Sequence, residues 1–165
     1  ETGEWAFMLT QSAPFEINRG LNGAYYDPDF SGQGLLLDIL PVTGMAFYAE
    51  FTFDTEHPMG GQHGQVGAQG NRWFTAQGTF EFGTNTLEVP VYTSSGGLFN
   101  HPMNVTTAAT GMLKLEFTNG CAGGIRSVNL DSGVQAQSKF QRLAADNMQY
   151  CEQQYEGPAV VTPWN

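Results

Sequence analysis

The chain has 165 residues, which is enough for one domain with a full hydrophobic core. Its 16 acidic residues outnumber its 6 basic residues, so the net charge is −10. The basic residues are scattered and form no stripe that would neutralise phosphates, which argues against nucleic acid as a partner and against anionic membrane surfaces.

The polar surface of this protein must come mainly from uncharged residues. Charged residues make up only 13% of the chain, about half of the ~25% that is usual in globular proteins. The chain holds 21 Gly, 12 Phe and 6 Tyr, a composition that favours short strands and tight turns. We therefore expect a secreted or cell-surface β-protein without a cofactor, and the chain, which begins at Glu1 without Met, is interpreted as a mature secreted form.

Strand signals follow one another along most of the chain. The pattern predicts strands over residues 23–27, 34–40, 45–54, 71–81, 86–92, 111–118, 125–130 and 134–143, and the apolar run 5–9 is a further strand candidate. Residues 98–110 are weakly patterned, and residues 56–70 form a long glycine-rich loop. Asn119-Gly120 predicts a hairpin turn, and residues 144–154 are the one helix candidate.

The strand count and the short connections predict an all-β domain. We expect an antiparallel, meander-rich barrel or a two-sheet sandwich of eight or nine strands, with a short C-terminal helix. Residues 1–165 are interpreted as a single domain with its core at about 22–151. The segments 1–21 and 152–165 are either peripheral or intermolecular. No apolar run approaches the ~20 residues of a membrane helix, so membrane insertion is not expected.

The two cysteines predict a disulfide. Cys121 and Cys151 lie 30 residues apart, with neither a CxxC motif nor nearby histidine ligands for zinc. In a secreted chain the disulfide would join the C-terminal helix to the end of a strand. Two buried free thiols are the alternative.

Several segments resemble a module found, often repeated, in secreted and cell-surface proteins of proteobacteria. The family pattern is an aromatic pair, then Asp/Asn-Pro, then Ser-Gly-x-Gly; it stands here as Tyr25-Tyr26-Asp27-Pro28 and Ser31-Gly32-Gln33-Gly34, with Tyr25 where Trp is usual. The resemblance covers residues 22–151 and implies an extracellular β-module with no assigned activity. The Gly23-Ala24-Tyr25 opening is also similar to avidin-like and lipocalin-like barrels, which is a hint about shape.

Metal sites have two candidate residue sets. Glu56, His57 and His63 lie in the glycine-rich loop, and His101 could join them only through tertiary folding. Their spacing matches no helical or strand zinc motif, so exposed loop histidines are the favoured interpretation. Asp27 and Asp29, with Ser31, alternate as oxygen ligands do in calcium loops, but Pro28 favours a turn in which Asp27 accepts backbone N–H groups.

Aromatic residues are the best candidates for a binding site. Each neighbouring pair must place one ring on each side of its strand. Rings that face outward could stack on sugars while neighbouring polar groups bind hydroxyls. The candidate ligand-binding residues are Tyr25, Tyr26, Trp73, Phe74 and Tyr92.

Catalytic signatures are absent, because no nucleophile motif or phosphate loop occurs. The leading hypothesis is therefore a non-catalytic extracellular module that binds a glycan or a protein through its surface. A second hypothesis is a fibre subunit that assembles with copies of itself by strand addition of residues 5–9. A third is a secreted hydrolase, which would use a loop metal or a carboxylate pair drawn from Glu50, Asp54, Glu81 and Glu88.

Overall fold

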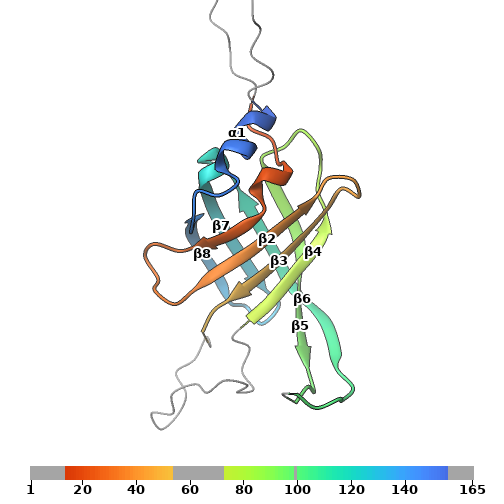
Figure 1. Cartoon of the computed structure of the whole chain (residues 1–165). Helices are drawn as coiled ribbons and strands as arrows, with labels where there is room; N and C mark the ends of the chain where they lie inside the picture. Colours follow the sequence, from red (N-terminus) through yellow and green to blue (C-terminus); the bar gives the residue numbers. More distant parts are fainter. Residues whose placement is uncertain (1–13, 54–72, 99, 156–165) are drawn as a thin grey trace, which may run out of the picture.

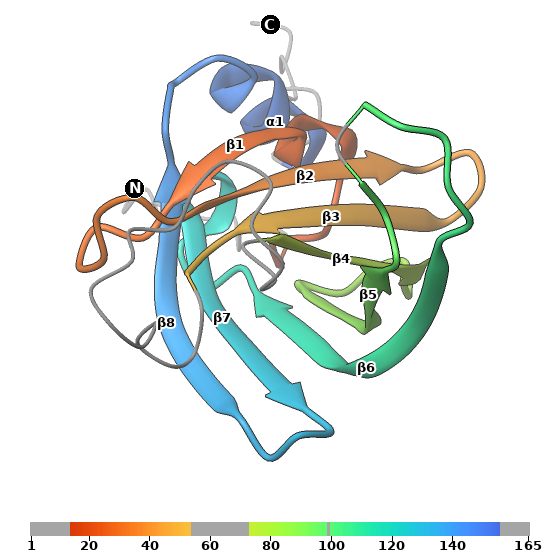
Figure 2. The same ribbon diagram turned by 90° about the horizontal axis from the view of Figure 1, so that it is seen from below.

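The computed structural model is a closed barrel of eight antiparallel strands, and it describes residues 14–53, 73–98 and 100–155 (Figures 1 and 2). The strands are β1 (Gly23–Tyr26), β2 (Gly34–Leu40), β3 (Met45–Phe51), β4 (Trp73–Thr79), β5 (Thr86–Ser95), β6 (Thr106–Glu116), β7 (Gly123–Leu130) and β8 (Gln135–Arg142). Each strand pairs with its neighbours in the chain, and β1 closes the barrel on β8. The predicted all-β class is confirmed, and of the two predicted architectures the barrel is the one observed.

The largest differences from the sequence-based prediction concern the bounds of β5, β6 and α1. β5 and β6 are longer than predicted and form a hairpin that takes in part of the weakly patterned residues 98–110. The hairpin predicted at Asn119-Gly120 is confirmed, because β6 and β7 pair antiparallel on either side of it, and its connection includes a short 3₁₀ helix, η2 (Gly120–Ala122). The C-terminal helix α1 (Met148–Tyr155) begins four residues later than predicted. Alternation identifies strands well only where one face is buried, so the exposed outer part of this hairpin, beyond the predicted strands 86–92 and 111–118, was missed.

The barrel interior is filled by side chains from alternate positions of all eight strands. Its most buried members are Tyr25, Ile39, Tyr48, Ala76, Leu87, Val89, Val91, Leu113 and Leu115. Edge-to-face packing links Phe140 to both Tyr25 and Phe117 at ring-centroid separations of 5.5 Å. The interior is therefore a packed core.

One strand is turned with its most apolar row outward. On β3, Tyr48 and Glu50 face the interior and are buried, while Phe47 and Phe51 are exposed. Hydropathy alone would favour the opposite arrangement, because Phe transfers from water more readily than Glu. Glu50 is accommodated inside because Arg126 of β7 meets it across the interior.

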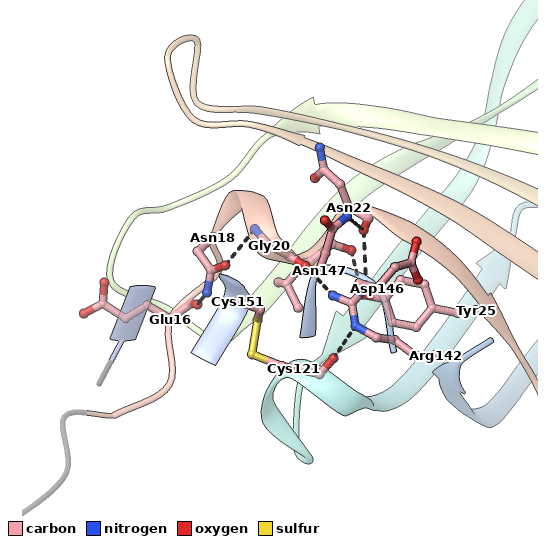
Figure 3. The surroundings of a disulfide bond; sticks show 11 residues. Glu16, Asn18, Gly20, Asn22, Tyr25, Cys121, Arg142, Asp146, Asn147 and Cys151 are labelled. Carbon is pink, nitrogen blue, oxygen red and sulfur yellow. Dashed lines mark hydrogen bonds between the residues drawn. A yellow bond between two sulfur atoms is a disulfide. The ribbon is translucent and has the colours of Figure 1, made fainter. Parts of the chain in front are cut away.

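A plug made from both ends of the described chain closes one end of the barrel (Figure 1). The 3₁₀ helix η1 (Arg19–Leu21) packs against α1, and the Cys121–Cys151 disulfide ties α1 to η2, as Figure 3 shows. Gly20 is required at this contact, since a Cβ there would lie 2.6 Å from the Cβ of Cys151. The predicted disulfide is confirmed.

Arg142, at the end of β8, joins the plug to the barrel (Figure 3). Its guanidinium donates to the backbone carbonyls of Gly20, of Asn22 at 3.3 Å and of Cys121 at 2.8 Å. It also lies 5.1 Å from the centroid of the Tyr25 ring, in a cation–π contact. Among the helices in the described ranges, none is long and apolar enough to cross a membrane.

Candidate functional site

The outer face of β3, β4 and β5 carries a cluster of aromatic side chains, here called the outer patch. Its members are Phe47 and Phe51 of β3, Trp73 of β4 and Tyr92 of β5. The β-ladder places Phe51 opposite Trp73, and it places Ala49 and Tyr92 on either side of Thr75. The small residues Ala49 and Thr75 therefore form a low floor between the rings.

Three of the four rings of the outer patch, those of Phe47, Phe51 and Trp73, are exposed to solvent. Phe51 and Trp73 keep 52% and 51% of their surface exposed, and Tyr92 is half-buried. On the β2 side, the residue opposite Phe51 is Gly34, which has no side chain to cover the ring. Leu36, Leu40 and Met45 extend the apolar surface over β2 and β3. Contiguous exposed apolar surface of this kind marks interaction sites.

A polar cleft continues from the outer patch toward the plugged end of the barrel. In the described ladder β4 pairs with β5 only at Thr75–Tyr92 and Ala76–Val91, and Pro90 has no N–H to extend it. Farther along, the end of β4, the β4–β5 connection and the start of β5 enclose an open cleft of about 460 Å³. It is lined by Thr79, Phe80, Glu81, Thr84, Thr86 and Glu88.

The cleft offers hydrogen-bonding groups next to the aromatic rings. Glu81 and Glu88, two of the predicted hydrolase carboxylates, contribute to its lining together with three threonines. Gln77 lies between the cleft and the outer patch, exposed on the same face of β4 and opposite Phe47 on β3. One strip of surface thus combines ring faces with carboxylate, hydroxyl and amide groups.

The five predicted binding residues fall into two groups. Tyr25 and Phe74 point into the core and are almost fully buried, so they are not available to a surface ligand. Tyr26, Trp73 and Tyr92 face outward. Trp73 and Tyr92 belong to the outer patch, whereas Tyr26 lies on β1 and contacts Gln141 of β8. Each predicted pair does place one ring on each side of its strand.

The predicted metal candidates are not brought together in the part of the chain that the structure describes. Asp27 accepts the backbone N–H of Asp29 at 2.9 Å, which is the turn favoured by the sequence. Glu56, His57 and His63 lie outside the described residues, and His101 is exposed on the β5–β6 connection. Within the described ranges no three His, Cys, Asp or Glu residues could hold a metal ion.

The third hydrolase candidate inside the described ranges, Glu50, belongs to a buried network. Arg126 donates to both carboxylate oxygens of Glu50, at 2.6 and 2.7 Å, and the Tyr48 hydroxyl also donates to this carboxylate. Burial raises the pKa of Glu50, and the Arg126 charge opposes this shift. The fourth candidate, Asp54, lies outside the described residues.

The space beside this network is too small for an organic ligand. A cavity of about 20 Å³, lined in part by Asp27, Glu50, Arg126 and Lys139, has room for about one water molecule. The Oδ2 atom of Asp27 is buried and has no hydrogen-bond partner among the described residues, so a bound water is a natural occupant of this cavity. We therefore interpret the Glu50–Arg126 network as a structural element of the core.

No family model, curated protein or solved structure matches this chain. The resemblance to the proteobacterial module consequently stays a prediction.

Sequence reasoning missed Phe47 and Phe51 as members of the site. Their alternation with Tyr48 and Glu50 was visible, but a period of two does not say which row faces the core. Glu50 was a usable signal, because a carboxylate that pairs with an arginine inside the barrel indicates that its row of β3 faces inward. That arginine, Arg126, is 76 residues away in the chain.

Proposed function

We propose that this protein is a non-catalytic, extracellular glycan-binding module, and that the glycan lies along the outer face of β3, β4 and β5. The observation that carries the proposal is the continuity of the outer patch with the polar cleft on one face. Phe51 and Trp73 offer exposed rings, Tyr92 lies half-buried beside them, and the cleft follows along β4 and β5.

The chemistry of this strip fits a sugar chain. Sugar rings have apolar C–H faces that stack on aromatic rings, and their hydroxyls need donors and acceptors nearby. Glu81, Glu88 and the threonine hydroxyls of the cleft provide acceptors, whereas the hydroxyls of Thr84 and Thr86 already donate to the Glu81 carbonyl and to the Asn85 side-chain oxygen. Because the cleft is acidic and the protein carries a net charge of −10, a neutral glycan is favoured over an acidic one.

Affinity electrophoresis and calorimetry against a panel of neutral and acidic polysaccharides test this proposal. Trp73→Ala and Phe51→Ala are each expected to weaken binding about fivefold or more, as loss of a stacked aromatic ring costs about 1–3 kcal/mol where rings stack on bases. Tyr150→Ala is the matched control, since Tyr150 is an exposed ring on α1 at the plugged end. Full retention of binding in Trp73→Ala would contradict the proposal.

The hydrolase alternative is separated from binding by the same samples. Release of reducing sugar that is abolished by Glu81→Gln or Glu88→Gln would make the cleft catalytic. Binding without such release supports the non-catalytic proposal. The fibre alternative, which assigns strand addition to residues 5–9, concerns a segment outside the described residues.

A further inference from the structure

The β5–β6 hairpin continues beyond the barrel as a two-stranded ribbon, defined here as residues 93–95 and 106–109. Figure 1 shows it projecting past the other described strands at the end opposite α1. Within the ribbon Thr93 pairs with Ala108 and Ser94 with Thr107, and the Ser94 and Thr107 hydroxyls are 2.8 Å apart. The ribbon is thus an ordered piece of β-structure outside the barrel wall.

The β6 side of the ribbon is a free strand edge in the described structure. Pairing of β6 with β7 begins only at Gly111 with Leu130, and the neighbouring Thr110 carbonyl accepts the backbone N–H of Asp131 at 2.9 Å. Thr110 is also the extra residue where the β5–β6 register shifts, and such a bulge bends a strand. From Thr106 to Ala109 the outward backbone groups have no strand partner among the described residues.

Residues 106–109 carry neither a charged side chain nor a proline, and no described element covers this edge. Proteins protect exposed edges with charged side chains, proline or a covering element. No Asp, Glu, Lys or Arg occurs between Glu88 and Lys114, and the edge itself reads Thr106-Thr107-Ala108-Ala109. The exposed apolar side chains of Leu98, Met103 and Val105 lie next to it on the β5–β6 connection.

Charge indicates which partner this edge fits. The molecule carries a net charge of −10, so most surfaces of two copies repel each other. The ribbon is uncharged and stands away from the acidic body, so two copies can approach there at little electrostatic cost. Antiparallel pairing of an edge with itself is generated by a two-fold axis, the commonest symmetry of oligomers.

We propose that the partner of this edge is a second copy of the chain, with residues 106–109 of the two copies pairing antiparallel across a two-fold axis. The product is a dimer with a four-stranded ribbon between two barrels. Main-chain hydrogen bonds provide the attraction, and the small Thr and Ala side chains allow close approach. The proposal is independent of glycan binding, because the outer patch is built on the barrel wall.

Sedimentation equilibrium of the full chain tests the association. The expected result is a mass that rises with concentration from 18.0 kDa toward twice that value at about 1 mM protein. Ala108→Glu places like charges at the shared edge and is expected to weaken association at least tenfold. Ser132→Glu in the exposed β7–β8 turn adds the same charge at the same end of the barrel and should leave association unchanged.

A cysteine scan locates the contact. Single cysteines at positions 106–109 are oxidised mildly with the Cys121–Cys151 disulfide in place, and circular dichroism checks that each variant is folded. Two-fold pairing of β6 predicts that at least one of these positions cross-links to itself, whereas Ser94→Cys on the β5 side does not. A monomer at every concentration, dimerisation that survives Ala108→Glu, or cross-links only from Ser94→Cys would overturn the proposal.

Discussion

Glu50 and Arg126 join opposite walls of the barrel through two hydrogen bonds of 2.6 and 2.7 Å. Only 5% of the Glu50 side chain and 13% of the Arg126 side chain remain exposed, so the pair is largely removed from water. This contact holds the Tyr48–Glu50 row of β3 inside the barrel. It thereby leaves Phe47 and Phe51 on the outside, where the outer patch forms.

Breaking this pair from one side should be costly. Glu50→Leu or Arg126→Met alone leaves one buried charge without its partner, and each is expected to lower the free energy of unfolding by about 3–5 kcal/mol. The double variant replaces both charges by apolar groups and should lose much less than the sum of the two. Urea unfolding of the wild type, the two single variants and the double variant measures how far the double loss falls short of the sum of the single losses. Strictly additive losses would show that the two residues act independently.

The raised pKa of Glu50 predicts a specific dependence of stability on pH. The carboxyl group of Glu50 binds a proton more tightly in the folded protein than in the unfolded chain, because burial disfavours the charged carboxylate. The stabilising contribution of protonation is therefore complete below the ordinary pKa of 4.5 and is lost as pH rises through the folded value. Comparing the unfolding free energies of the wild type and Glu50→Gln across pH measures it. A difference that grows in the opposite direction would place the folded pKa below 4.5.

Two of the six tyrosines should resist ionisation in the folded protein. Burial raises the pKa of Tyr25 to about 12, against the opposing effect of Arg142, and burial also raises the pKa of Tyr48 well above 10.0. The stability that the two raised pKa values contribute is complete below about pH 10, the ordinary pKa of tyrosine. It is lost as pH rises through the pKa values of the folded protein. Absorbance titration should show both phenols ionising only as the barrel unfolds. In Tyr48→Phe the number of delayed phenols should fall by one.

The disulfide should stabilise the plugged end and leave the barrel topology intact. Closing a loop between residues 30 apart in the chain restricts the unfolded chain by about 3–4 kcal/mol in the entropy model. The free energy of unfolding of Cys121→Ala/Cys151→Ala is therefore expected to be lower than that of the wild type by this amount, so the variant should unfold at a lower denaturant concentration. Far-ultraviolet circular dichroism should retain the strand signal below the transition. Loss of that signal before any denaturant is added would mean that the barrel cannot form without the bond.

Local sequence patterns predicted most of the strands. β2 was placed correctly at both ends, where Gly34 follows a turn motif and Pro41 cannot continue the ladder. The exposed half of the β5–β6 hairpin was not predicted, because Thr106, Thr107, Ala108 and Ala109 show no alternation when neither face is buried. The plug was also beyond prediction, since Arg142 meets Gly20 and Asn22 only after the chain has closed on itself.

The sequence by itself determined the all-β class, the positions of most strands and turns, and the cysteine pairing, since all of these depend on neighbouring residues or on there being only two cysteines. The tertiary structure decided that the strands close into a barrel and that Phe51 and Trp73 face outward beside the polar cleft. The physical reason is that alternation along a strand defines two faces but does not say which of them is buried. Contacts between distant residues, such as Glu50 with Arg126, decide which face is buried.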